Sequence, residues 1–429
     1  MTRIAVIGGG AAGTLQALHL AKAGIGPVTL IERTREPGRG VAYSTQRPEH
    51  LLNVPARRMS AFADDPEHFT RWFAERTGAT AEDYAPRMLY GTYLAGLLSE
   101  AGIEAVKGEA VDVVGDKVLL ADGSRIDADV VILAPGNFKP ATPRGIDPAT
   151  LGPIWVEDPW AEGIADGLGA GDVVLLLGTG LTAVDAALTL EAAGFAGRIL
   201  ALSRRGLAPR AHGPREPVTA PCENLPPNCI KMLRRVRGRS ASLGWRSAVY
   251  ELRTVTQDLW RRAGPEERRR FLRHLRPWWD VHRHKLAPAV GATIDAMQDE
   301  GRLSIAGGRL VSAEADGDRA IVRFRPRGRD QVDELRVARI VNCTGPEADI
   351  ARAGEPLLSA LLASGRICAD VLKVGIHVDG ECRVMDARGR ASDTLYAIGP
   401  VTKGSFWESV AVPDIRTQAE RIAKLIAAA

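Results

Sequence analysis

Short runs of apolar residues, each ending in glycine, recur along the chain and predict buried strands. Each of two such runs is followed by a glycine-rich turn, a stretch rich in helix formers and another apolar run. The series strand, helix, strand falls at 4–7, 14–23 and 28–31, and again at 173–177, 184–193 and 199–202. The pattern therefore predicts two βαβ units with parallel strands.

The turn of the first unit has the spacing GxGxxG. Gly8 permits a tight turn, Gly10 lets the backbone approach a pyrophosphate, and Gly13 lets helix and strand pack closely. The helix N-terminus offers N–H groups to phosphates, and Glu32 at the end of the next strand can accept from a ribose hydroxyl. We expect the nucleotide to contact Gly8, Gly10, Ala11, Ala12, Gly13, Glu32 and Arg33.

The second unit carries GxGxxA, and its second strand ends in Ser203-Arg204-Arg205 without an acidic residue. A carboxylate there would repel a 2′-phosphate, whereas arginine pairs with it. This favours NADPH over NADH; the alternative is that the two arginines are merely solvated. The predicted contacts are Gly178, Gly180, Leu181, Thr182, Ser203, Arg204 and Arg205.

A first site with glutamate and a second with arginine fit FAD followed by NADPH, in an α/β fold with two Rossmann-like domains. In such proteins the NADPH domain is inserted into the FAD domain. We expect a FAD-binding domain over 1–165 and 345–429 and an NAD(P)H-binding domain over 166–344. Apolar runs at 129–134, 339–342 and 394–398 predict the strands at which the chain leaves and re-enters the FAD domain, and Pro413 fits the start of a terminal helix.

Composition excludes several classes of protein. The chain is 45% hydrophobic and 25% charged, as in ordinary globular proteins, and no run reaches the length of a membrane helix. The cysteines are scattered, with no CxxC, which argues against a zinc site and against a disulfide reductase, and we expect no metal ligands. We read them as reduced thiols in a cytoplasmic protein; they are Cys222, Cys229, Cys343, Cys368 and Cys382.

A helical insertion is expected over 213–300, within the NAD(P)H domain. Residues 231–285 hold 16 basic and 5 acidic residues, a balance of +11 in a chain whose net charge is +4. Three interpretations compete: helices with solvated arginine faces, a cap over the flavin that binds an anionic substrate or the NADPH phosphates, and nucleic-acid binding, which no known motif supports. His282, Arg283 and His284 are the candidate substrate contacts, with histidines bonded to backbone as the alternative.

Several further stretches are distinctive. They are GRGVAY at 38–43, HLLNVPA at 50–56, MSAF at 59–62, DPEHF at 65–69, PRMLYGTYL at 86–94, SRRG at 203–206, PRAH at 209–212, RPWWDVHRH at 276–284 and WESVAVPDIR at 407–416. Together they resemble the bacterial FAD/NAD(P)-binding protein family that includes a flavin-dependent urate hydroxylase and an aspartate N-monooxygenase. The resemblance covers nearly the whole chain; one departure is Ala12, where a bulkier residue is expected.

The resemblance implies bound FAD, reduction by a nicotinamide cofactor and insertion of oxygen. Our leading hypothesis is a monooxygenase that uses NADPH and molecular oxygen and acts through a C4a-(hydro)peroxyflavin on a small anionic or amine-bearing substrate. By position, the resemblance implies further FAD contacts at Gly40, Asn53, Val54, Met59, Ala134, Gly136, Gly399 and Val412. Candidates near the oxygen site are Asn53, Lys403, Trp407 and Glu408. The alternatives are a flavin reductase or dehydrogenase without oxygen insertion, and a non-catalytic FAD-binding redox protein.

Overall fold

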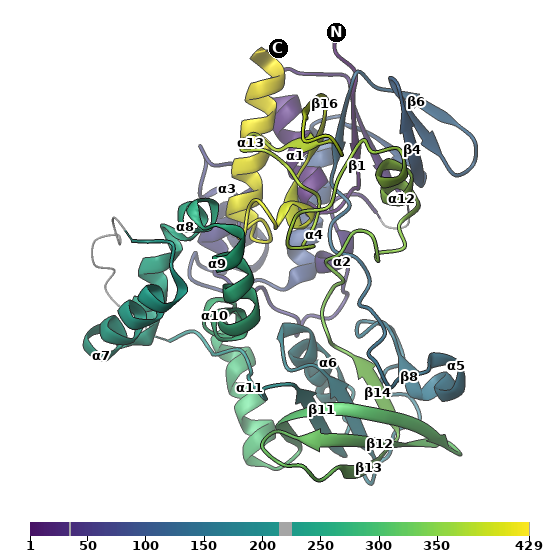
Figure 1. The fold of residues 1–429 in the computed structure, drawn as a ribbon, viewed down its shortest axis with the longest axis vertical. Coiled ribbons are helices and arrows are strands. Elements are labelled where there is room, and N and C mark those ends of the chain that lie inside the picture. Colours follow the sequence, from purple (N-terminus) through teal and green to yellow (C-terminus); the bar gives the residue numbers. More distant parts are fainter. Residues whose placement is uncertain (34–35, 214–224, 429) are drawn as a thin grey trace.

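The computed structural model describes residues 1–33, 36–213 and 225–428. It consists of two lobes built on parallel sheets, with a group of helices at one side (Figure 1). Both chain termini lie on the first lobe, which is the upper one in the figure. The expected α/β class with two Rossmann-like units is confirmed.

The first lobe contains a six-stranded sheet in the order β15-β16-β7-β1-β2-β3. Its strands are β1 (Ile4–Ile7), β2 (Val28–Glu32), β3 (Glu104–Lys107), β7 (Val130–Leu133), β15 (Arg383–Met385) and β16 (Ala391–Ala397). All neighbours are parallel except the β15–β16 pair. The strand expected near the C-terminus is β16, so the chain returns to the first sheet after the second lobe.

Helices and a small sheet surround this core. The helices are α1 (Ala11–Lys22), α2 (Gly40–Tyr43), α3 (His68–Thr77), α4 (Arg87–Glu100), α12 (Pro356–Ala363) and α13 (Val412–Ala428), with 3-10 turns at Ala56–Arg58 and Gly399–Thr402. The small sheet is β4 (Ala110–Val114), β5 (Lys117–Leu120) and β6 (Arg125–Asp127). The terminal helix α13 packs against α1 (Figure 1).

The second lobe contains a seven-stranded sheet in the order β13-β12-β11-β10-β9-β14-β8. Its strands are β8 (Trp155–Val156), β9 (Val173–Leu177), β10 (Arg198–Ser203), β11 (Leu303–Asp316), β12 (Arg319–Pro326), β13 (Asp333–Val337) and β14 (Arg339–Asn342). Its helices are α5 (Pro148–Leu151), α6 (Leu181–Ala192) and α11 (Pro288–Asp299), with a 3-10 turn at Gly152–Ile154. Strands β11, β12 and β13 form an antiparallel extension of the sheet.

The domain boundary expected at residue 165 lies after a strand that already belongs to the second sheet. Strand β8 pairs in parallel with β14, and Leu151 and Ile154 are buried in the hydrophobic core of the second lobe. The sequence did not reveal this strand because two residues form no periodic pattern.

The insertion is helical, as expected. It comprises α7 (Cys229–Arg253), which is kinked at Gly244, then α8 (Thr256–Arg262), α9 (Pro265–Arg270), a π-helical turn (Phe271–Leu275) and α10 (Arg276–Arg283). Its predicted first residues, 214–224, which include Cys222, lie outside the described residues.

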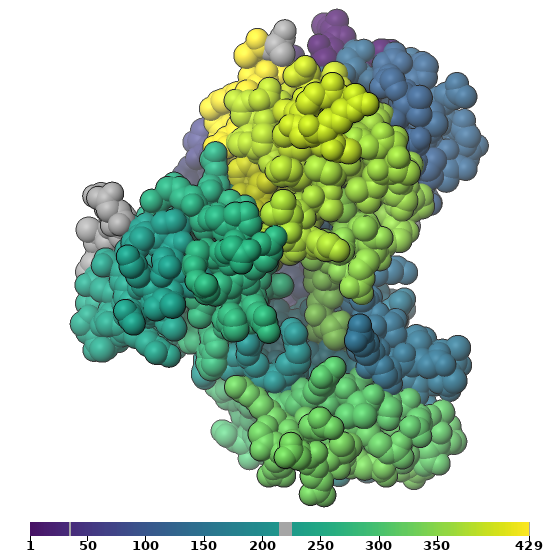
Figure 2. Space-filling model, viewed as in Figure 1, coloured from purple at the N-terminus to yellow at the C-terminus, as the bar shows by residue number. Residues whose placement is uncertain are grey.

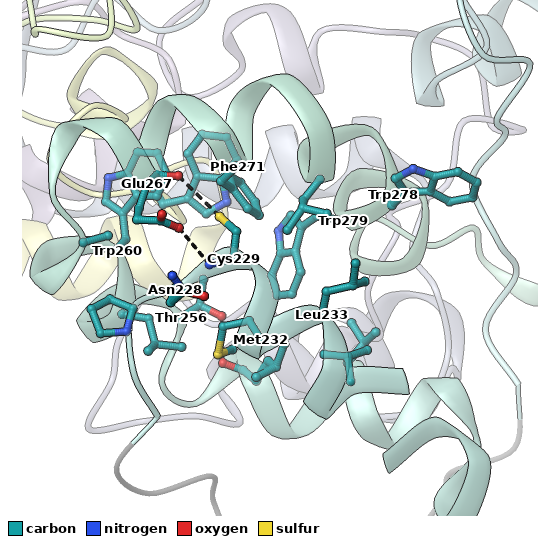
Figure 3. A pocket seen from close by; sticks show the side chains of 18 of the residues that line it. Asn228, Cys229, Met232, Leu233, Thr256, Trp260, Glu267, Phe271, Trp278 and Trp279 are labelled. Carbon is teal, nitrogen blue, oxygen red and sulfur yellow. Dashed lines mark hydrogen bonds between the residues drawn. The ribbon is translucent and has the colours of Figure 1, made fainter. Parts of the chain in front are cut away.

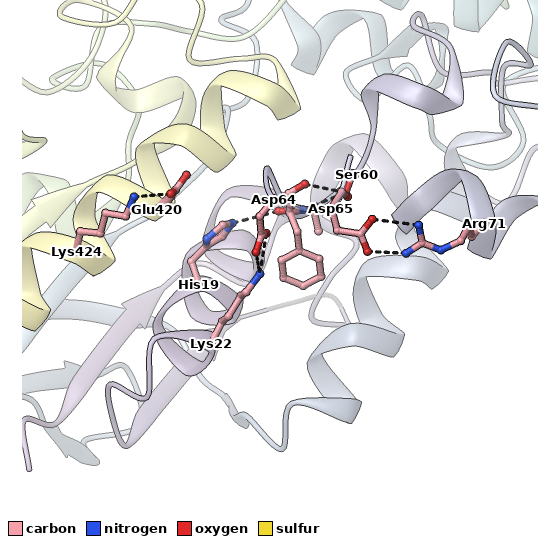
Figure 4. A network of polar contacts seen from close by, with 10 residues as sticks. His19, Lys22, Ser60, Asp64, Asp65, Arg71, Glu420 and Lys424 are labelled. Carbon is pink, nitrogen blue, oxygen red and sulfur yellow. Dashed lines mark hydrogen bonds and ion pairs between the residues drawn. The ribbon is translucent and has the colours of Figure 1, made fainter. Parts of the chain in front are cut away.

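Ion pairs and hydrogen bonds anchor one loop of the first lobe. Asp64 pairs with Lys22 of α1 at 2.5 Å, and Asp65 pairs with Arg71 of α3 at 2.5 Å (Figure 4). His19 of α1 contacts the backbone oxygen of Ala61 at 3.1 Å. The carboxylates of this loop therefore connect it to α1 and α3, and they do not line the cavities described below.

Residues of two distinctive stretches hold the second lobe against the first. Arg87 donates to Asp185 of α6 at 2.7 Å, in an ion pair whose side chains are 16% and 13% exposed. Trp160 Nε1 donates to the same carboxylate at 3.0 Å. His50 Nε2 lies 3.1 Å from both the backbone oxygen of Asp185 and the hydroxyl of Thr189. These contacts fix the position of α6, whose N-terminus faces the second glycine-rich turn.

Candidate active site

The first glycine-rich turn is a cradle that larger residues cannot form. Gly8 has φ +110°, and a Cβ there would lie 2.1 Å from the backbone oxygen of Ala134. A Cβ on Gly13 would lie 1.8 Å from the backbone oxygen of Gly8. Both glycines are therefore required for β1, β7 and α1 to approach one another.

The N-terminus of α1 is free to bind a phosphate. Gly10 caps the helix without a side-chain hydrogen bond, and no acidic residue occupies the first turn. The N–H groups of this turn and the positive end of the helix dipole suit a pyrophosphate. Glu32, at the end of β2, accepts from the Gly9 N–H at 2.8 Å, which holds its carboxylate beside the turn.

A cavity follows this cradle and is lined by most of the residues expected to bind FAD. They are Gly8, Gly10, Ala11, Ala12, Glu32, Arg33, Gly40, Ala134, Gly136 and Val412. Arg33 also pairs with Glu355 at 2.6 Å. Gly399 lies against Ala12, since a Cβ on Gly399 would be 2.8 Å from the Ala12 Cβ. The small residue at position 12 therefore leaves room for the turn that precedes α13.

The second glycine-rich turn repeats this construction. Gly178 has φ +129°, and a Cβ there would lie 2.1 Å from the backbone oxygen of Cys343, just after β14. Helix α6 begins after Gly180, again without a side-chain cap or an acidic residue in its first turn. A Cβ on Gly180 would meet no atom within 4 Å, so the backbone here faces open space.

A cavity of about 920 Å³ extends from this turn between the lobes. Figure 2 shows the surface hollowed where the two lobes and the insertion meet. Of the residues expected to bind NADPH, the cavity is lined by Gly178, Gly180, Leu181, Thr182, Ser203 and Arg204. Arg205 does not line it, and instead donates to the backbone oxygen of Arg273 at 3.3 Å.

The two cavities adjoin. Gly136, Asn137, Pro400 and Val410 line both of them. Gly136 follows β7, which ends beside the first cradle, and Pro400 precedes the loop that leads into α13. A ligand in each cradle can therefore reach the same short stretch of wall.

Charged and aromatic side chains gather on the interdomain cavity near this wall. Lys403 Nζ lies 4.5 Å from the centroid of the buried Trp407 ring. Burial, together with the nearby Arg276, lowers the pKa of Lys403 to about 8. Burial lowers the pKa of His284 to about 3, with Arg283 adding to the effect, so this imidazole is neutral at physiological pH. Burial raises the pKa of Asp280. Of these three side chains, Lys403 is therefore the one that can exchange protons near neutral pH.

Glu408 and Arg283 form a buried ion pair beside this group. The Glu408 carboxylate accepts from Arg283 at 2.7 Å, and the two side chains are 5% and 11% exposed. Both predicted site residues are thus tied to each other. The pair connects α10 of the insertion to the loop before α13.

A third cavity lies on the other side of this pair and is basic. Asn53 and Val54 line it, as do His282 and Arg283. The backbone oxygen of Asn53 contacts His212 Nε2 at 3.0 Å. Five further cations line the cavity: Arg57, Arg58, Arg246, Arg253 and Lys285. An anionic group suits these walls better than a cationic one.

Most of the expected site residues are therefore divided among three cavities; those that line none of the three are Gly13, Met59, Arg205, Gly399 and Glu408. Lys403, Trp407 and His284 line the interdomain cavity, whereas Asn53, Val54 and His282 line the basic one. Met59 is buried in the hydrophobic core of the first lobe. Sequence reasoning missed Arg276, Asp280 and Arg309, which also line the interdomain cavity. Arg276 and Asp280 belong to the distinctive stretch at 276–284, which was the available signal.

Metal sites and reactive thiols have few candidate residues in the described part of the chain. It contains no group of three or more His, Cys, Asp or Glu side chains that could hold a metal ion. Its cysteines are free, and burial raises the pKa of Cys229 to about 11 and of Cys382 to about 12. Burial also raises the pKa of Cys343, which lines the interdomain cavity. These thiols stay protonated at neutral pH and are poor nucleophiles. None of the described helices is long and apolar enough to cross a membrane.

Comparison with solved structures establishes the fold. This chain is similar to a cadaverine monooxygenase of Erwinia amylovora, with a TM-score of 0.70 and 13% identity, and the match covers 100% of this chain and 95% of the monooxygenase. It is also similar to an ornithine N-hydroxylase of Kutzneria sp. 744, with a TM-score of 0.69 and 15% identity, and this match covers 100% of this chain and 99% of the hydroxylase. A bacillithiol disulfide reductase of Bacillus cereus has the same fold at a TM-score of 0.60 and 13% identity, over 100% and 99%.

Comparison by sequence gives one result for the first lobe. No curated protein matches the chain. Residues 5–138, which include the first cradle and β7, match the model of a family described as FAD-NAD(P)-binding.

Proposed function

We propose that this chain is a FAD-dependent, NADPH-reduced monooxygenase that acts on a small anionic or amine-bearing substrate. The observation that carries the proposal is that two nucleotide cradles open into cavities with a common wall at Gly136, Asn137, Pro400 and Val410. When bound, FAD supplies the transfer of electrons from NADPH to molecular oxygen. The structural neighbours whose titles name a cadaverine monooxygenase and an ornithine N-hydroxylase support oxygen insertion.

The first cradle suits FAD and the second suits NADPH. In the first, Glu32 stands where it can accept from a ribose hydroxyl, and the start of α1 receives the pyrophosphate. In the second, no carboxylate opposes a 2′-phosphate, and Arg204 is exposed on the cavity wall. Arg309 on β11 lines the same cavity and adds a second positive charge.

The residues beyond the common wall suit oxygen chemistry. The buried Trp407 ring, with Val401 and Val410, makes part of the wall apolar, and Lys403 can hold or release a proton, since its pKa is about 8. The basic third cavity offers a place for an anionic part of the substrate. The resemblance to the family that includes urate hydroxylase and aspartate N-monooxygenase agrees with oxygen chemistry and with an anionic substrate. The proposal also includes the cytoplasmic location inferred from the sequence.

A flavin reductase without oxygen insertion is the second candidate, since a disulfide reductase has the same fold. Thiol–disulfide exchange needs an ionised thiol, and the raised pKa values of Cys229, Cys343 and Cys382 disfavour it. The experiment described next distinguishes a reductase with another acceptor from the proposed monooxygenase.

The test is turnover under 18O2 with NADPH and a panel of amines, amino acids and organic acids. The proposal expects a substrate that accelerates NADPH oxidation and gains one labelled oxygen. Hydrogen peroxide alone with every compound, at an unchanged rate of NADPH oxidation, contradicts the monooxygenase proposal and favours the reductase.

A further inference from the structure

The helical insertion encloses an apolar cavity that none of the proposed cofactor roles uses. Its volume is about 450 Å³, within the range of cavities that hold small organic ligands. Figure 3 shows side chains of α7, α8, α9 and α10 converging on it. Aliphatic residues such as Met232, Leu233 and Leu259 form part of the wall, and tryptophans at 245, 260, 278, 279 and 407 form much of the rest.

The insertion packs around this cavity instead of around a filled core. Among the described residues, the buried members of its own hydrophobic cluster are Leu225 and Leu252, each 7% exposed. Met232, Val236, Leu259 and others of that cluster are partly buried, and the same side chains line the cavity. Water finds few partners on such walls, so the site favours an apolar occupant.

One buried donor of the cavity wall lacks a hydrogen-bond partner among the described residues. The indole Nε1 of Trp279 is buried and has no hydrogen-bond partner among the described residues. Two other polar groups of the wall are paired: Trp260 Nε1 donates to the Gly404 oxygen at 2.8 Å, and the Glu267 carboxylate accepts from the Cys229 N–H at 2.9 Å. An unpaired buried donor favours a ligand that carries an acceptor.

Protein cations already lie over three of the five tryptophan rings, which disfavours a cage for a further cation. Arg246 lies 4.5 Å from the Trp245 ring centroid, and Arg268 lies 5.3 Å from that of Trp260. Lys403 lies over Trp407. A further positive charge would be repelled here, whereas a neutral or negative group would not.

We propose that this cavity binds a neutral or anionic molecule with an aromatic or branched alkyl body and a hydrogen-bond acceptor for Trp279. The cavity adjoins both polar cavities, since Trp407 also lines the interdomain cavity and His282 also lines the basic one. We assign the bound molecule as the substrate, an assignment that rests on the proposed function. Its apolar body lies in the insertion and its reacting end points toward Trp407. The substrate class then differs from the aliphatic diamine named for the cadaverine monooxygenase.

The test is calorimetric titration of the FAD-loaded full chain with three probes that share one hydrocarbon: 4-phenylbutyrate, 4-phenylbutanamide and 4-phenylbutylamine. The carboxylate and the amide are expected to bind at least tenfold more tightly than the amine. Leu233→Trp fills the cavity and is expected to weaken both by more than tenfold. Ile230→Trp is the matched control, because Ile230 lies on the same helix but is 52% exposed and does not line the cavity.

Trp279→Phe keeps an aromatic ring at this position but removes the indole N–H donor, and it is expected to weaken amide binding by about fivefold, the value of one hydrogen bond. Flavin content and melting temperature must stay at wild-type values for each variant to count. The site is refuted if no probe binds, if the amine binds as tightly as the others, or if Leu233→Trp and Ile230→Trp affect binding equally.

The substrate assignment is read separately, from NADPH oxidation with the same probes. A probe that binds in the cavity yet leaves the rate unchanged contradicts the substrate role while the binding site stands. If the flavin is not reduced by NADPH at all, the proposed function fails, and the calorimetric result still decides the binding site.

Discussion

Replacement of Arg204 by alanine tests the assignment of NADPH to the second cradle. Arg204 is exposed on the wall of the interdomain cavity, next to the strand end where the 2′-phosphate of a bound dinucleotide lies. The structure gives it no hydrogen bond or ion pair with another described residue. The guanidinium is therefore available to a phosphate.

The expected magnitude follows from this exposure. A hydrogen bond to a charged group contributes about 1.5–3 kcal/mol, and exposure to solvent places this contact at the lower end. The Arg204→Ala variant should therefore lose about tenfold in kcat/KM for NADPH and less than twofold for NADH. Arg309 lines the same cavity and retains part of the affinity in the variant.

Arg205→Ala is the matched control, since it removes the same side chain from the neighbouring position. Arg205 does not line the cavity, and it donates to the backbone oxygen of Arg273. Steady-state kinetics with both nucleotides should leave its preference for NADPH unchanged. Equal losses for NADPH and NADH in Arg204→Ala, or a larger loss of NADPH preference in Arg205→Ala, would refute the assignment.

Three further predictions concern the same region. Gly180→Ala should keep the melting temperature but raise KM for NADPH at least tenfold, because the added Cβ meets no protein atom yet enters the space of the phosphates. Gly178→Ala should unfold at a lower temperature, because the added Cβ clashes with the backbone. Lys403 has a pKa of about 8 in the folded protein, below its unfolded value, so it binds fewer protons in the folded state between pH 8 and 10.5. The free energy of unfolding should therefore rise across that window by up to about 3 kcal/mol. In denaturant titrations, Lys403→Met should abolish this rise. Glu408→Gln leaves Arg283 buried without its partner and should destabilise the fold by about 3–5 kcal/mol, while adding Arg283→Met should restore most of the loss; an additive double mutant would argue against coupling.

The parallel-sheet units could be predicted from the sequence because their signals are local. An apolar run, a glycine turn and a helix at fixed spacing specify both cradles, and the structure places Gly8 and Gly178 against equivalent backbone oxygens. The helices begin earlier than expected, at Ala11 and Leu181, because the glycine turn leads directly into the first helical turn.

The surroundings of the candidate site could not be predicted in the same way because they depend on contacts between distant segments. The pairing of β8 with β14 and the antiparallel extension of β11 carry no local signal strong enough to place them. Arg204 and Arg205 are indistinguishable in sequence, yet only Arg204 lines the cavity. The tryptophans of the insertion were visible in the sequence, but the cavity they surround forms only when four helices and the loop at Trp407 come together.

The account depends most on the claim that a nucleotide in the second cradle reduces a flavin in the first. Anaerobic mixing of the FAD-loaded chain with NADPH or NADH in a stopped-flow instrument, followed by the visible absorbance of the flavin, measures this directly. The account predicts saturable bleaching that is faster with NADPH, slowed by Gly180→Ala and unaffected by Arg205→Ala. Absence of bleaching with both nucleotides, or bleaching at the same rate in Gly180→Ala, would contradict it.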